Sequence, residues 1–188
     1  AAAIVEDYGR RFPAEDLQAL LGEECPDKSP WLSVFTSMFL HGGWLHLLGN
    51  MWFLWLFGNN VEDVMGHGRF IVFYLLVGLA ATVAHVVSAP GSVLPTIGAS
   101  GAISGVMGAY LMLYPRVRIQ TVFVFIIFLR VIPVPAWLVL IMWFALQVMM
   151  GYATPADTGG VAVWAHVGGF VAGIALQRPL LLLRYRGA

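Results

Sequence analysis

Serine and histidine side chains lie inside apolar stretches of this chain, where polar groups are rare. Ser100 follows a glycine and an alanine at the start of one stretch, and His166 lies within another. A serine hydroxyl beside an imidazole can perform acyl transfer, because the imidazole takes the hydroxyl proton and later returns it to the leaving amine. His46 and Asn50 are four residues apart, so on a helix they share one face and can both donate hydrogen bonds to an oxyanion. These four residues predict a hydrolytic site.

The start of the stretch at Ser100 adds backbone donors to this predicted site. A helix that begins there leaves its first N–H groups unpaired, and the positive end of its dipole points to the same place. No Asp or Glu lies at the same depth to orient His166, so we expect a Ser–His dyad rather than a triad.

The composition of the chain indicates that its solvent is lipid. Of its 188 residues, 60% are hydrophobic and 11% are charged, against about 45–50% and about 25% in soluble domains. A soluble domain of this size would still expose roughly a third of its unfolded surface, which is too much for so apolar a chain. Ten basic residues offset ten acidic ones, so nothing predicts a nucleic-acid partner, and the single Cys25 excludes an internal disulfide and a cysteine-based zinc cluster.

Polar interruptions divide the apolar part of the chain into five candidate membrane spans. Each span approaches the about 20 residues that cross a bilayer core as a helix. The apolar run Thr121–Leu129 is too short to cross, and Pro133 and Pro135 close the stretch after it. We therefore expect an interfacial or partly inserted connection there, with Arg130 at its end. The five spans are expected at residues 43–59, 69–88, 99–114, 135–152 and 159–177.

The basic residues predict the orientation of the spans. Alternation places seven of them on one side, namely Arg69, Arg116, Arg118, Arg130, Arg178, Arg184 and Arg186, and three on the other, namely Arg10, Arg11 and Lys28. The side with more basic residues is expected to be cytoplasmic. We therefore expect an extracytoplasmic segment at residues 1–30, a membrane domain at 31–178 and a cytoplasmic basic tail at 179–188, with a further span or signal ahead of residue 1.

Helix lengths place three of the polar side chains at one depth. A helix over residues 100–114 rises about 22 Å, less than the roughly 30 Å of a hydrocarbon core. If the arginines that follow it lie at the cytoplasmic interface, Ser100 lies about 8 Å below the outer interface. His166 and Asn50 each lie seven residues into their spans, or about 10 Å deep. Small residues would let the serine and histidine helices approach closely, namely Gly101, Gly105, Ala109, Gly169 and Gly173.

Purely structural explanations exist for each of these residues. Ser100 is also a good helix N-cap, and glycines four residues apart report helix packing rather than catalysis. A lone histidine in a span is often a packed, hydrogen-bonded residue, which is our interpretation of His85. His41 fits a loop at the interface, and Glu62 fits a solvated or capping position at the end of the first span.

Three sequence runs resemble those of the rhomboid intramembrane serine proteases. They stand in the order and with the separations of that family, and the resemblance covers about residues 30–178. The runs are HGGWLHLLGN at residues 41–50, GASGAISG at 98–105 and AHVGGFVAG at 165–173.

The resemblance implies a role for each residue that matches a family position. By that likeness Ser100 is the nucleophile and His166 is the base. His46 and Asn50 form the oxyanion hole together with the Ser100 amide. The supporting positions are Glu62, which would tie helices together at the cytoplasmic end, and the close-packing glycines Gly98, Gly169 and Gly173.

Two positions depart from the family pattern. Leu32 and Ser33 stand where family members often carry a Trp-Arg pair, which puts the role of that pair in seating a loop in lipid in doubt for this chain. Ser104 stands where a tyrosine often lies beneath the catalytic histidine. A serine cannot stack on His166, so we expect another group to hold that ring.

The resemblance implies an all-α membrane protein, a polytopic rhomboid-like helical bundle with five of the family's six spans in this chain. The expected function is endopeptidase cleavage of transmembrane segments, with transmembrane protein substrates and membrane lipid as partners. No cofactor and no metal are expected. The expected location is the cell (inner) membrane, with the C-terminus in the cytoplasm and the site open to the extracytoplasmic side.

Three other classes of protein are weighed against this interpretation. A catalytically silent rhomboid-like protein would bind membrane helices without cleaving them, and the retention of Ser100 and His166 argues against it. A metal or haem protein would need spaced histidine ligands, but the helical i, i+4 pair here is His46 with Asn50, and an amide is a poor ligand for soft metals. A transporter would need charged residues in the interior of the spans to carry an ion pathway, and there are none there.

Overall fold

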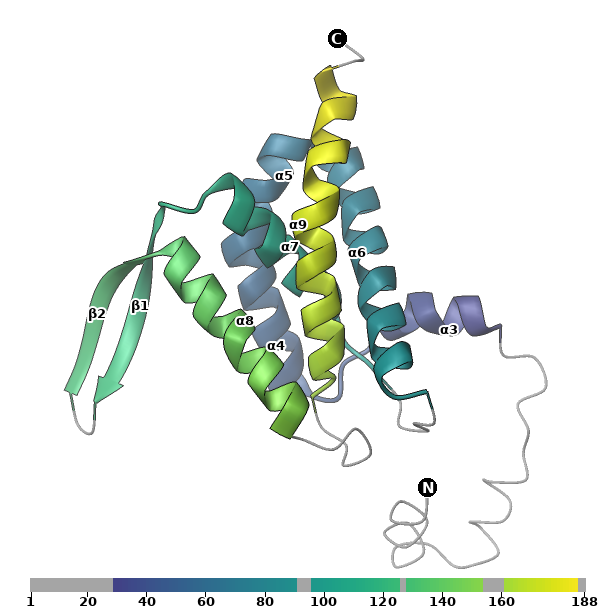
Figure 1. The fold of residues 1–188 in the computed structure, drawn as a ribbon, viewed down its shortest axis with the longest axis horizontal. Helices are drawn as coiled ribbons and strands as arrows, with labels where there is room; N and C mark the ends of the chain where they lie inside the picture. The colour runs from purple at the N-terminus through teal and green to yellow at the C-terminus, as the bar shows by residue number, and fades with distance from the viewer. Residues whose placement is uncertain (1–28, 91–95, 126–127, 154–160, 186–188) are drawn as a thin grey trace, which may run out of the picture.

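The computed structural model describes residues 29–90, 96–125, 128–153 and 161–185, most of which form helices (Figure 1). The predicted extracytoplasmic segment therefore lies, up to residue 28, outside the described residues, as does the end of the predicted basic tail. In chain order the elements are α3 (Pro30–Ser37), α4 (Trp44–Phe53), the π-helix η1 (Leu54–Gly58), α5 (Asn59–Met65), α6 (His67–Ser88), α7 (Ser100–Leu113), β1 (Arg118–Phe125), β2 (Phe128–Pro135), α8 (Ala136–Ala153) and α9 (Val163–Tyr185).

The predicted helical bundle is confirmed, and helices occupy all five of the expected runs. Among the described residues, α6, α8 and the part of α9 up to Leu182 are long and apolar enough to cross a membrane, while α7 is a shorter apolar helix. Helix α7 has 14 residues and rises about 21 Å. It therefore ends short of at least one surface of a bilayer core, as its expected length indicated.

The first helical run is longer than expected. We predicted its end at residue 59, because Glu62 and Asp63 interrupt the apolar pattern, but helix continues through η1 and α5 to Met65. Val61 and Met65 are fully buried in the core and hold this last stretch in place. Gly66 ends it with a φ of 81°, and its N–H donates to the Glu62 carbonyl at 2.6 Å. A glycine is favoured there because other residues rarely adopt a positive φ.

Helix α7 lies at the centre of the bundle, where it packs against both α9 and α6 (Figure 1). Ten consecutive residues, Gly101–Tyr110, are buried, and a helix that is covered on every side belongs to the interior of a bundle. Helices α7 and α9 touch through their backbones. A methyl group added to Gly169 would overlap the Gly101 carbonyl, and one added to Gly173 would overlap the Gly105 carbonyl. Only glycine allows this approach.

This close contact predicts a stability effect at Gly173. We expect Gly173→Ala to lower the free energy of unfolding by about 1–3 kcal/mol, because the added methyl forces α7 and α9 apart. The unfolding temperature in detergent should fall by several degrees. Gly68→Ala is the matched control, since a methyl at Gly68 meets nothing within 4 Å. Equal unfolding temperatures for the two variants would contradict this packing.

The connection between α7 and α8 is an antiparallel hairpin, in which β1 pairs with β2 from Arg118 opposite Pro135 onward. We predicted an interfacial or partly inserted connection here but no strands. Pro133 and Pro135 lack an N–H, which a two-stranded sheet tolerates because both strands are edges. The hairpin projects from the bundle beside α8 (Figure 1). At its base the Ala136 N–H donates to the Val117 carbonyl at 2.8 Å, which fixes the start of α8.

Helix α3 was not predicted, and it supports the segment that leads into α7. Pro30 occupies its first turn and Ser29 precedes it as the N-cap, with the Leu32 N–H donating to the Ser29 hydroxyl at 3.5 Å. Leu32 itself is exposed. At the other end the Ser37 carbonyl accepts the Gly98 N–H at 2.9 Å. The end of α3 therefore anchors the two residues before Ser100.

Candidate active site

Ser100 and His166 come from two helices that are in backbone contact. Ser100 is the first residue of α7, and His166 lies near the start of α9. The His166 Nε2 and the Ser100 Oγ are 2.8 Å apart, and both residues are half-buried. This is the separation of a hydrogen bond between a nucleophile and its base. The structure thus brings together two residues that are 66 positions apart in the sequence.

Gly98 shapes the turn that precedes the serine. Its φ is 119°, a conformation that side chains other than glycine rarely adopt. A methyl group added to Gly98 would lie 2.7 Å from the His46 Nε2 and 3.8 Å from the Asn50 Nδ2. The backbone at Gly98 therefore lies directly against two side-chain nitrogens, and the absence of a side chain lets them approach the start of α7.

The His46 ring is arranged to present an N–H near Gly98. Its Nδ1 accepts the Gly42 N–H at 3.3 Å, so the proton of a neutral ring is on Nε2. The His41 ring lies edge-on to the His46 ring, with 5.0 Å between ring centroids, and its own Nδ1 is 3.2 Å from the Phe39 carbonyl. His41 thus borders the site as well, on the loop before α4.

Asn50 carries a buried donor with no partner. Its side chain is 7% exposed, and within the described part of the chain its Nδ2 makes no hydrogen bond. Leaving such a donor unpaired costs about 1–3 kcal/mol. Because the same nitrogen lies near Gly98, it is available to an acceptor that enters beside Ser100. An oxyanion is the kind of acceptor that such donors stabilise best.

Helix α8 contributes two side chains to His166 that we did not predict. The His166 Nδ1 is 2.8 Å from the Gln147 Oε1, and the Trp143 ring lies against the imidazole with 5.9 Å between centroids and 35° between planes. Asn50 is the one amide that we predicted in the site, and Gln147 was passed over. Gln147 is the only carboxamide in residues 136–151, and this could have indicated its role.

Ser104, which departs from the family pattern, fixes the backbone of the histidine. Its hydroxyl is fully buried and lies 2.7 Å from the Gly101 carbonyl and 2.9 Å from the His166 carbonyl. One hydroxyl proton is therefore shared between an acceptor on its own helix and one on α9. The expectation that another group holds the imidazole ring is met by Gln147 and Trp143.

Glu62 and His85 form no hydrogen bond with Ser100 or His166 in the described part of the chain. The Glu62 carboxylate accepts a hydrogen bond from the His67 Nδ1 at 2.5 Å, which joins α5 to the first residue of α6. His85 is half-buried in α6 and its Nδ1 has no partner among the described residues. In the described ranges, no three His, Cys, Asp or Glu side chains are close enough together to hold a metal ion.

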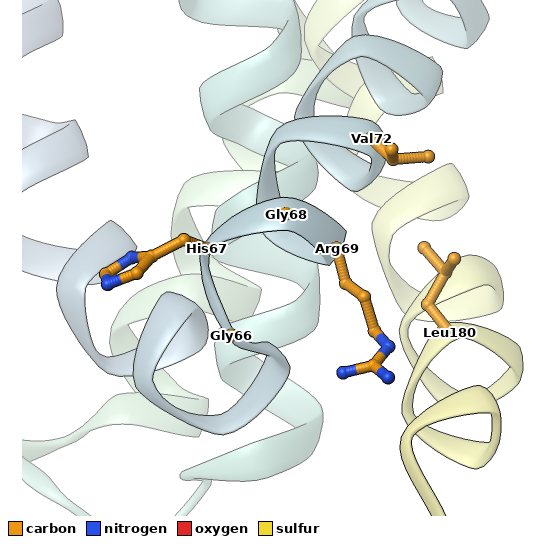
Figure 2. A pocket seen from close by; sticks show the side chains of 6 residues that line it. All are labelled: Gly66, His67, Gly68, Arg69, Val72 and Leu180. Atoms are coloured by element: carbon orange, nitrogen blue, oxygen red, sulfur yellow. The ribbon is translucent and has the colours of Figure 1, made fainter. Parts of the chain in front are cut away.

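A groove at the far end of the bundle is separate from the serine (Figure 2). Arg69 and Val72 of α6 face Leu180 of α9 across it, and Gly66, His67 and Gly68 complete its lining. Leu180 lies 14 residues beyond His166 on the same helix, which corresponds to about 21 Å. The groove therefore takes no part in the chemistry at Ser100.

Comparison with known proteins gives one consistent result. Residues 28–182 match the family model described as the Rhomboid domain. Over 149 residues the chain is 33% identical to the protein named "Rhomboid protease GluP" of Bacillus subtilis (strain 168), covering 79% of this chain and 27% of that protein. Over 149 residues it is 30% identical to "RHOMBOID-like protein 5" of Arabidopsis thaliana, covering 79% and 44%.

A shorter match has a higher sequence identity. Over 81 residues the chain is 36% identical to "Putative rhomboid protease YdcA" of Bacillus subtilis (strain 168), covering 43% of this chain and 40% of that protein. The chain thus spans less than half of the length of each of these three relatives.

Proposed function

The chain belongs to the rhomboid family, and from this premise we propose that it is an intramembrane serine endopeptidase. The family and the apolar helices make it an integral membrane protein. The observation that carries the proposal is the 2.8 Å pairing of the Ser100 hydroxyl with the His166 imidazole. The side-chain nitrogens of His46 and Asn50 lie beside Gly98, just before this pair. The names of two relatives, which describe rhomboid proteases, support the same activity.

The first chemical step is acylation of Ser100. The Ser100 Oγ attacks the carbonyl carbon of the scissile peptide bond while its proton moves to the His166 Nε2. A bond forms between Oγ and carbon, and the carbonyl oxygen becomes an oxyanion. The Nε2 proton then passes to the peptide nitrogen, so that the carbon–nitrogen bond breaks and the amine leaves. The acyl group remains on Ser100.

The oxyanion is stabilised by donors that are already in place. The His46 Nε2–H and the Asn50 Nδ2–H lie on one side of the Gly98 turn, and the first N–H groups of α7 lie at its other end. A donor that needs no reorganisation during the reaction lowers the barrier most. Because the Asn50 Nδ2 has no hydrogen bond to give up within the described chain, its whole interaction is available to the transition state.

Deacylation reverses the roles with water as the nucleophile. His166 takes a proton from water through Nε2, the water oxygen attacks the acyl carbon, and the proton returns to the Ser100 Oγ as the ester bond breaks. Water must therefore reach the start of α7. Irregular backbone at membrane depth is stable only where it is buried in protein or wet, so we assign the segment around Gly98 to a water-filled cavity.

The substrates are transmembrane segments of other membrane proteins. The C-terminus is cytoplasmic in this proposal, because Arg69 at the start of α6, Arg116 and Arg118 after the end of α7, and Arg178 towards the end of α9 lie at the end of the bundle opposite Ser100. Ser100 then lies below the extracytoplasmic surface of the cell (inner) membrane. Cleavage is expected on the extracytoplasmic side of the substrate's span, at the level that the start of α7 reaches.

Labelling with a serine-reactive probe tests this proposal without knowledge of the substrate. We expect a fluorophosphonate or an isocoumarin to modify the purified protein in detergent at one residue, Ser100, because its hydroxyl has a base 2.8 Å away. Mass spectrometry of the labelled peptide identifies the site. Ser88→Ala should label as the wild type does, since the Ser88 hydroxyl donates to the His85 carbonyl of its own helix. An unlabelled wild-type protein would favour a rhomboid-like protein that binds membrane helices without cleaving them.

A further inference from the structure

Gln147 is a buried amide on a helix most of whose apolar side chains are exposed or half-buried. Helix α8 presents exposed residues such as Trp137, Met142 and Met149 to its surroundings, whereas Gln147 is 9% exposed. Burying an amide is costly unless it forms a hydrogen bond. Its Oε1 lies 2.8 Å from the His166 Nδ1. The imidazole thus has a hydrogen-bond partner at each nitrogen, Ser100 at Nε2 and Gln147 at Nδ1. The Nδ1 bond takes no direct part in the dyad chemistry.

The Gln147 oxygen determines which nitrogen of His166 carries the proton. A neutral imidazole has one N–H, and a carbonyl oxygen can only accept. The hydrogen bond therefore requires the Nδ1–H tautomer of His166, which leaves Nε2 without a proton and able to accept the one on the Ser100 Oγ. The opposite tautomer would place an N–H against the serine oxygen, and in that state His166 could not act as a base.

Trp143 restrains the plane of the same ring. It lies one helical turn before Gln147 on α8, so both side chains point from one face of that helix. The Trp143 ring contacts the imidazole and also lies 5.9 Å from the Phe170 ring, which follows one turn after His166. The ring is thus held at its edge by an amide, with a tilted indole ring beside it.

We propose that Gln147 is a positioning residue that fixes His166 in the Nδ1–H tautomer and, with Trp143, orients its Nε2 towards Ser100. The proposal rests on the proposed function, because it explains how that base is kept competent. During acylation the Ser100 proton moves to Nε2, the imidazole becomes positive, and its Nδ1–H remains bonded to the Gln147 oxygen. The same Nε2 proton then leaves on the amine, and the starting tautomer is restored.

An amide suits this position better than a carboxylate would. Serine proteases with a triad use a buried aspartate for the same orienting task. A charge buried in a membrane bundle is costly to desolvate, while a neutral amide accepts the same hydrogen bond with a smaller penalty. The chain can therefore orient its base without a third ionisable group.

The test compares two near-isosteric variants and one neighbour at pH 8. Gln147→Met removes the acceptor but keeps the size of the side chain, and Gln147→Glu keeps an acceptor. Leu146→Met is the matched control, because Leu146 is 53% exposed and adjacent on α8. We expect Gln147→Met to lower kcat by about 10–100-fold on a single-span substrate in liposomes, with KM within two-fold. Gln147→Glu and Leu146→Met should retain kcat within about five-fold.

A spectroscopic measurement separates positioning from a merely structural role. In 15N NMR of imidazole-labelled protein, the wild-type His166 should show a protonated Nδ1 and an unprotonated Nε2, and Gln147→Met should show a mixture of the two tautomers or the Nε2–H form. An unchanged tautomer in Gln147→Met, or a kcat within three-fold of the wild type, would overturn the proposal. The proposal would also be overturned if Gln147→Met and Gln147→Glu lost kcat to the same extent and were destabilised to the same extent.

The NMR readout also distinguishes this proposal from the proposed function. It needs folded protein but no turnover. A wild-type protein that neither cleaves substrate nor reacts with a fluorophosphonate would reject the endopeptidase, whereas the tautomer of His166 would still support or reject the role of Gln147.

Discussion

Replacing Ser100 with alanine is expected to abolish cleavage of a single-span substrate in detergent or liposomes, and His166→Ala should do the same. Removing either member of such a pair costs about 10⁴–10⁶ in kcat, because the two act as one unit. The double variant should therefore be no slower than either single variant. The measurement is product formation on gels, followed over hours. It would detect a variant that keeps much more activity than this loss of kcat allows.

The controls for this experiment are the unfolding temperature of each variant and the activity of Ser88→Ala. Ser100→Ala removes one half-buried hydroxyl and its hydrogen bond to His166, which is worth about 1 kcal/mol. The unfolding temperature should therefore change little, and Ser88→Ala should cleave at the wild-type rate. Activity that survives in Ser100→Ala or in His166→Ala would refute the dyad, provided that the protein is free of other proteases.

Removing the oxyanion donors should produce the second largest effect. We expect Asn50→Ala to lower kcat by about 10²–10³-fold, which is the usual cost of one such donor, with little change in KM. The reason is that the interaction is made in the transition state and not with bound substrate. His46→Ala should lose a similar factor, because its Nε2 lies on the same side of the Gly98 turn.

Asn50 allows catalysis and stability to be measured separately. Its Nδ2 is buried without a partner within the described residues, so Asn50→Ala removes an unsatisfied donor and should leave the unfolding temperature equal to or above that of the wild type. Asn60→Ala is the matched control, since the exposed Asn60 side chain donates weakly to the Leu56 carbonyl at 3.4 Å. A kcat for Asn50→Ala within three-fold of the wild type would rule out its role as an oxyanion donor.

Much of the fold was predictable, because a membrane imposes simple rules on sequence. An apolar run of about 20 residues becomes a helix, since no other open structure satisfies its backbone in lipid. The five expected runs are helical, and α7 begins at Ser100 as the pattern indicated. The errors fell where polar residues interrupt a helix without ending it. We interpreted Glu62 and Asp63 as part of a loop, although they belong to a helical turn that the buried residues Val61 and Met65 anchor in the core.

The hairpin after α7 could not be predicted by the same rules. A short apolar run is ambiguous between helix, strand and loop, because its partner decides its state. Here β1 finds that partner in β2, the next element along the chain. Helix α3 was missed for a related reason, since its Ser29 cap and Pro30 give only a local indication of a start.

The sequence by itself determined that the chain is embedded in lipid, where its five apolar helical runs lie, and which four polar residues are conspicuous within them, three of these at one depth. It did so because polar groups in lipid are costly and therefore few. Only the tertiary structure decided that Ser100 and His166 lie 2.8 Å apart, and that Gln147 of α8 meets the far side of the same imidazole. Those contacts join residues 66 and 19 positions apart. Periodicity reports which face of one helix is apolar, whereas the packing of one helix against another sets the distance between their side chains.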